Sequence, residues 1–85
     1  MENAELDKII AELDELVEKN DFKQVKKICS DLLKKHPKEA DFWFYLARAE
    51  NALDNKKTAI EHYNETIKLN HEYQLAYNNR GLILL

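Results

Sequence analysis

Two apolar stripes lie next to each other between Ala40 and Asn70, with the short polar joint Asp54-Asn55 between them. Within each stripe the apolar residues recur at intervals that place them on one side of an α-helix. The first stripe contains Trp43, Leu46, Ala47 and Leu53, and the second contains Ala59, Ile60, Tyr63, Ile67 and Leu69. A short polar joint makes consecutive helices antiparallel neighbours, so this stretch is predicted to be a helical hairpin.

The hairpin resembles one tetratricopeptide repeat, a helix-turn-helix unit of 34 residues with a fixed order of aromatic, small and apolar positions. The matching residues are Trp43, Leu46, Ala47, Ala59 and Tyr63, at the family's Trp, Leu, Gly, Ala and aromatic positions. Two positions differ from the family pattern, because Glu50 stands where a large aromatic is usual and His71 where Pro is usual.

Steps of 34 residues in either direction extend the resemblance over nearly the whole chain. Backwards, Ala59, Tyr63, Ile67 and His71 correspond to Val25, Cys29, Leu33 and Pro37. Forwards, Trp43 and Ala47 correspond to Tyr77 and Gly81. The resemblance implies an all-α fold, a right-handed superhelix of antiparallel helix hairpins. One domain over residues 1–85 would contain repeats at about 6–39 and 40–73 and a partial repeat at 74–85.

The element boundaries follow from capping and helix-breaking residues. Helices are predicted from Asn3 or Ala4 to Lys19, over Phe22–Lys35, Glu39–Leu53 and Lys56–Leu69, and from Glu72 or Tyr73 to the last residue. Asp21 and Gln24 have the spacing of a capping box, and Pro37 ends the second helix. Asn70 is expected to adopt the left-handed conformation after the fourth helix.

Composition favours a soluble intracellular chain. No apolar run approaches the roughly 18 residues of a membrane span, and the acidic N-terminus is unlike a signal peptide. Cys29 is the only cysteine, which favours a reducing compartment, and we expect a cytoplasmic protein that does not bind membranes.

Charge is segregated along the chain. Residues 1–18 carry seven acidic side chains and one Lys, whereas 19–38 carry seven Lys and two Asp. These charges are interpreted as solvated outer faces of two neighbouring helices. The alternative is a basic patch for nucleic acid. However, the Lys set contains no Arg and lies beside an acidic helix, so no nucleic-acid partner is expected.

Catalysis has weak support. His36, His62 and His71 lack the spacing of metal-binding pairs, and the single Gly81 excludes a glycine-rich phosphate loop. Cys29 lies in an apolar stripe and is interpreted as a core residue. The chain is therefore predicted to be no enzyme and to need no cofactor or metal.

Protein binding has better support. The resemblance places the inner, concave positions on Ile10, Asp14, Phe44, Tyr45, Arg48, Asn51, Leu75, Asn78, Asn79 and Leu82. The predicted peptide-binding residues among them are Phe44, Tyr45, Arg48, Asn51, Asn78 and Asn79. Exposed rings would anchor apolar side chains, Asn amides would bind the peptide backbone and Arg48 a carboxylate. Alternatively, Phe44 and Tyr45 pack against the preceding repeat. The residues at the carboxylate-clamp positions of chaperone-binding members differ, so that specificity is not expected.

The last helix suggests a second function. It is apolar nearly all round, and such a helix requires burial. The residues predicted for self-association are Leu75, Leu82, Ile83 and Leu85. A homo-oligomer formed through this helix, or a regulatory docking segment of a larger protein, is therefore the alternative to a peptide-binding adaptor.

Overall fold

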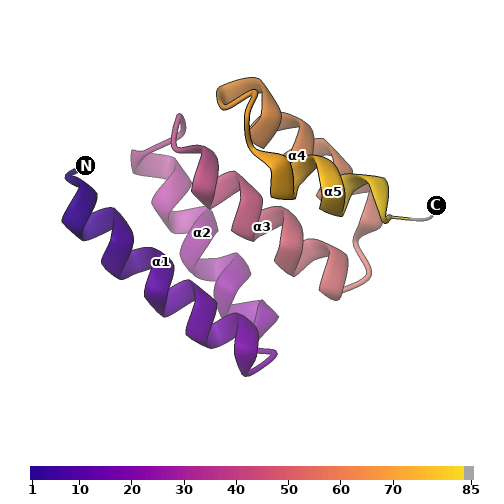
Figure 1. The fold of residues 1–85 in the computed structure, drawn as a ribbon. Coiled ribbons are helices and arrows are strands. Elements are labelled where there is room, and N and C mark those ends of the chain that lie inside the picture. Colours follow the sequence, from indigo (N-terminus) through magenta and orange to yellow (C-terminus); the bar gives the residue numbers. More distant parts are fainter. Residues whose placement is uncertain (84–85) are drawn as a thin grey trace.

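Five α-helices and no strand occur within residues 1–83, the part of the chain that the computed structural model describes. They are α1 (Asn3–Glu18), α2 (Phe22–Lys35), α3 (Ala40–Ala52), α4 (Lys56–Leu69) and α5 (Gln74–Gly81). Consecutive helices run antiparallel through short joints (Figure 1). The predicted all-α arrangement of helix hairpins is confirmed. No helix in this part of the chain combines the length and the apolar character needed to cross a membrane.

The predicted boundaries are accurate for α2 and α4 and differ by a residue or two elsewhere. The exception is α5, which ends at Gly81 rather than continuing to the last residue. After Gly81 the backbone tightens into i to i−3 hydrogen bonds, in which the Leu82 and Ile83 N–H groups donate to Asn79 and Arg80 oxygens at 3.3 and 3.2 Å. The prediction of a continuous last helix is therefore wrong at this point.

The turn inside each hairpin contains one residue in the left-handed region. Asn20 has φ 59° and Asp54 has φ 67°, and both residue types tolerate this conformation better than most. The following N–H in each turn donates back to the helix that has just ended, from Asp21 to Leu16 at 2.9 Å and from Asn55 to Glu50 at 2.8 Å. The two turns thus close their helices in the same way.

Asn70 does not adopt the predicted left-handed conformation. Its backbone is extended, with φ −145°, and its side-chain oxygen accepts a hydrogen bond from the Glu72 N–H at 3.0 Å. This local bond gives the backbone a different way to leave the helix.

The joints between hairpins also recur after 34 residues. The matching N–H to oxygen bonds are His36 to Leu32 and Asn70 to Thr66 (2.8 and 2.9 Å), Glu39 to His36 and Tyr73 to Asn70 (3.2 Å each), and Phe42 to Glu39 and Ala76 to Tyr73 (3.2 and 3.1 Å). Hydrogen bonds at equal offsets mean that the backbone follows the same path from α2 into α3 as from α4 into α5.

The core is centred on α3, which packs on both α2 and α4. Side chains at equivalent positions share its deepest layer; the pairs Leu13 and Ala47, Val25 and Ala59, Cys29 and Tyr63, and Phe42 and Ala76 are all at most 1% exposed. Trp43 is half-buried beside α4, and its indole N–H donates to the Pro37 oxygen at 2.8 Å. Equivalent residues therefore occupy equivalent environments.

The left-handed turn residue provides a test of this geometry. Asp54→Val should lower the free energy of unfolding by about 1–2 kcal/mol, because a β-branched residue is strained at positive φ. The control Asn55→Val, at φ −96°, should cost about 0.5 kcal/mol or less. Urea unfolding followed by circular dichroism measures both; equal costs would contradict the assigned turn.

Candidate binding surface on α1, α3 and α5

The first helices of the hairpins, α1 and α3, and the helix α5 lie on one side of the molecule, with α2 and α4 on the other (Figure 1). Their residues at steps of 34 form two rows. The first row is Asp7, Asp41 and Leu75, and the second row is Asp14, Arg48 and Leu82. We call the surface defined by these six residues the front face. All of them are exposed except Asp41, which is half-buried.

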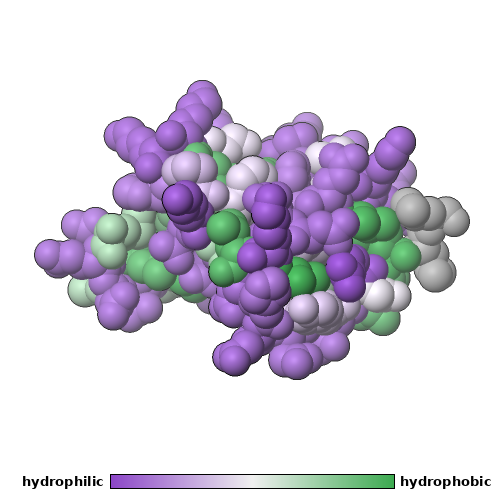
Figure 2. All heavy atoms as spheres, turned by 90° about the horizontal axis from the view of Figure 1, so that it is seen from above, coloured by the Kyte–Doolittle hydropathy of each residue, from purple (hydrophilic) through white to green (hydrophobic). Residues whose placement is uncertain are grey.

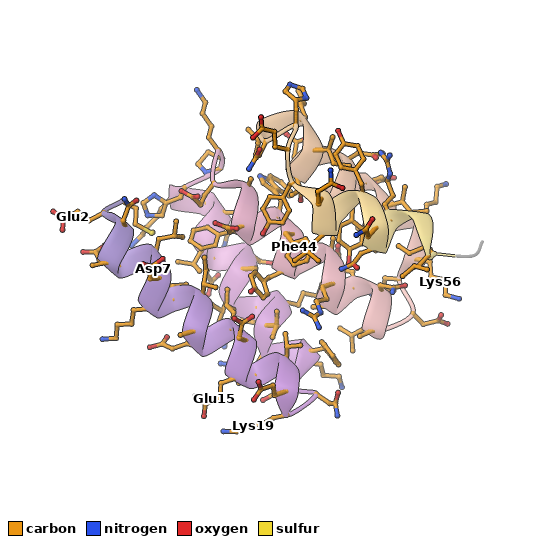
Figure 3. The ribbon with its side chains drawn as sticks, viewed as in Figure 1. Glu2, Asp7, Glu15, Lys19, Phe44 and Lys56 are labelled. Atoms are coloured by element: carbon orange, nitrogen blue, oxygen red, sulfur yellow. The ribbon has the colours of Figure 1, made fainter. Side chains whose placement is uncertain are left out.

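Phe44 and Tyr45 do not present exposed rings, so this part of the prediction is wrong. Their exposed fractions are 3% and 7%. The Phe44 ring lies 5.4, 5.9 and 5.0 Å from the ring centres of Tyr45, Tyr63 and Tyr73, in the space between α3 and α5 (Figure 3). Phe44 therefore joins α3 to the following hairpin and not to the preceding one, and its burial adds packing energy.

Two tyrosine hydroxyls tie neighbouring helices together across the front face. The Tyr45 hydroxyl donates to the Asp14 carboxylate of α1, and the Tyr73 hydroxyl, at the start of α5, donates to the Asp41 carboxylate of α3 at 2.6 Å. Burial and then the adjacent carboxylate raise the pKa of both Tyr45 and Tyr73. The phenols remain hydrogen-bond donors, so each carboxylate is held in a defined position.

The remaining predicted binding residues are polar and accessible. Arg48, Asn51 and Asn78 are exposed, and Asn79 is half-buried beside the Tyr63 hydroxyl. The Arg48 guanidinium is close enough to favour the charged form of Tyr45. A guanidinium and side-chain amides supply donors for a carboxylate or for peptide groups.

The predicted self-association residues divide into three groups. Leu75 and Leu82 are 58% and 77% exposed, whereas Ile83 is half-buried and packs against the core. Leu85 lies outside the described residues. Figure 2 shows hydrophobic surface at the end of the molecule where α5 lies, next to a mostly hydrophilic exterior.

The sequence prediction missed a buried polar pair between α3 and α4. Glu50 is 3% exposed, and its carboxylate lies 2.5 Å from Nδ1 of His62, whose ring also packs at 5.2 Å on Trp43. A carboxylate in an apolar helix stripe was the available signal, since such a group requires a polar partner from the facing helix. His62 is thus part of the hairpin interface, not a solvated surface residue.

Cys29 belongs to the core. Burial raises the pKa of its thiol from 9.0 to about 12, which keeps it in the unreactive protonated form. Within residues 1–83, no group of three or more His, Cys, Asp or Glu side chains is placed to hold a metal ion. Comparison with known protein families, curated proteins and solved structures gives no match to the chain.

The Glu50–His62 pair is expected to be conditional on both partners. His62→Ala should lower the free energy of unfolding by about 1–3 kcal/mol, because a buried polar group loses its partner. Adding Glu50→Leu should recover part of this loss by replacing that group with an apolar one. Denaturant unfolding of the three proteins tests this, and a double variant less stable than His62→Ala would contradict it.

Stability should fall in alkaline solution. Because the folded pKa of Cys29 lies above 9.0, the unfolded state loses its thiol proton first as pH rises, and unfolding becomes easier by at most about 1.4 kcal/mol per pH unit. Unfolding free energies measured from pH 8 to 10 should therefore decline less steeply for Cys29→Ala than for the unsubstituted chain, in the window that begins near pH 9.0. Equal slopes would contradict the raised pKa.

Proposed function

We propose that the chain is a segment of tetratricopeptide-repeat type that binds a peptide or helix of another protein on its front face and catalyses no reaction. The observation that carries the proposal is the recurrence of turn hydrogen bonds at steps of 34 residues, the repeat length of that family. Buried residues recur at the same step, as Val25 and Ala59 do. Repeats of this kind stack through equivalent side chains and leave one continuous surface for a ligand.

The polar side chains of α3 and α5 support a binding role for this surface. Arg48 and Asn51 lie one turn apart on α3, and Asn78 lies on α5. All three are exposed beside the packed aromatic residues, which hold the backbone from which they extend. A rigid scaffold with free donors lowers the entropic cost of binding an extended peptide.

The same proposal includes a cytoplasmic location. Cys29 is a free, buried thiol, as is common for small apolar core positions in a reducing compartment. No reactive role is assigned to it.

Self-association is a second candidate, favoured by the exposure of Leu75 and Leu82 on α5. Exposed leucines that share one side of a helix are typical of interaction surfaces. A two-fold pairing of α5 would cover them with their counterparts in another copy.

Selection of peptides from a random displayed library tests the leading proposal. Peptides that bind the chain should bind Arg48→Ala/Asn78→Ala about tenfold more weakly, which corresponds to the loss of roughly one charge-assisted hydrogen bond. Fluorescence anisotropy with labelled copies of the selected peptides measures the change.

A matched control removes one cation and one amide from the opposite layer. Lys57→Ala/Gln24→Ala changes exposed residues of α4 and α2 and should leave binding unchanged. Peptides that respond to this control and not to the front-face variant would contradict the proposed site, as would a library without binders.

A further inference from the structure

The two exposed leucines of α5 belong to the front face. Leu75 and Leu82 are seven residues apart, a spacing that brings them to the same side of a helix. Their equivalents are Asp41 and Arg48 on α3. The front face therefore changes in character from one helix to the next, from carboxylates on α1, through mixed charges on α3, to leucines on α5.

Stacking of a further helix does not account for these leucines. α3 already has α2 and α4 packed on it, yet Arg48 remains exposed and Asp41 half-buried. The positions of α3 that meet the following helix are others, such as Trp43, whose ring contacts His62 of α4. A helix following α5 in the same way would meet Tyr77, the equivalent of Trp43, and would leave the leucines uncovered.

The charges of the front face indicate what would complement its other end. The first row carries two carboxylates and no cation, Asp7 on α1 and Asp41 on α3. Asp41 is held in place by the Tyr73 hydroxyl at 2.6 Å, so its carboxylate is positioned before any ligand arrives. In the second row the charge of Arg48 offsets that of Asp14. A cation is therefore favoured over the first row.

We propose that the partner is a segment that is aliphatic at one end and cationic at the other and crosses the front face from α5 to α1. This rests on the proposed function and names its ligand class. The aliphatic side chains cover Leu75 and Leu82, and Lys or Arg side chains meet Asp41 and Asp7. Packed helices are about 10 Å apart, so an extended segment advances roughly three residues from one helix to the next.

Synthetic peptides of about 12 residues, enough to cross three helices in an extended conformation, provide the probes. The first has two leucines at one end and a lysine at every third position of the remainder. The second has glutamate in place of each lysine, and the third has serine in place of each leucine. The first should bind at least about tenfold more tightly than the others, and its affinity should decrease as salt is added.

Substitutions in the chain identify the contacts. Asp7→Lys should weaken the first peptide and strengthen the second. Glu12→Lys makes the same charge change on the opposite side of α1 and should affect neither in this way; both side chains are exposed. Leu82→Ser should weaken the first peptide and leave the third unchanged. Equal responses to Asp7→Lys and Glu12→Lys, or equal binding of all three peptides, would overturn the proposal.

Two outcomes separate this inference from the broader function. If library peptides depend on Arg48 but carry neither leucine-like nor cationic residues in this order, the binding function stands and the ligand class is wrong. If light scattering gives a dimer that Leu82→Ser converts to a monomer, the leucines are covered by a second copy and the proposed partner is overturned.

Discussion

Burial of α3 between two other helices is the constraint on which the rest of the structure depends. Seven of its thirteen residues are buried, so most of its circumference is committed to packing. Ala47 and Ala49 are completely buried, and side chains this small allow neighbouring helices to approach closely. What remains accessible is a narrow strip that includes Arg48 and Asn51. The core and the candidate binding surface are therefore two consequences of the same helix.

The hydrogen bonds between tyrosines and aspartates extend this order to the neighbouring helices. α1 is joined to α3 through Asp14 and Tyr45, and the start of α5 is joined to α3 through Tyr73 and Asp41. Each bond has one partner largely removed from water and one carboxylate near the surface, an arrangement in which a directional contact orients an accessible charge. The front face is thus built on fixed positions rather than on loops.

Much of the fold could be predicted from sequence because its signals are local. Apolar spacing, the Asp54-Asn55 joint and Pro37 located the helices, and the boundaries of α2 and α4 were predicted to the residue. A step of 34 residues located equivalent positions before any coordinates were considered, and Val25 and Ala59 are equally buried. These features depend on the chain within a turn or two of each residue.

The errors concern contacts between elements. Phe44 was expected to be exposed because Trp43, Leu46 and Ala47 already account for one apolar stripe, but α3 is surrounded on several sides and a single stripe underestimates its burial. The Glu50–His62 pair joins residues on different helices, and helical spacing within one element carries no information about such a partner. Asn70 followed a side-chain hydrogen bond instead of its statistical preference.

Native-state hydrogen exchange, measured residue by residue by NMR, tests the central role of α3 most directly. If α3 is the shared core of both hairpins, its amides should exchange only through global unfolding, and the amides of α1 and α5 should exchange through smaller openings at lower free energy. Amides of α1 protected as strongly as those of α3, or α3 amides that exchange by local opening, would contradict this account.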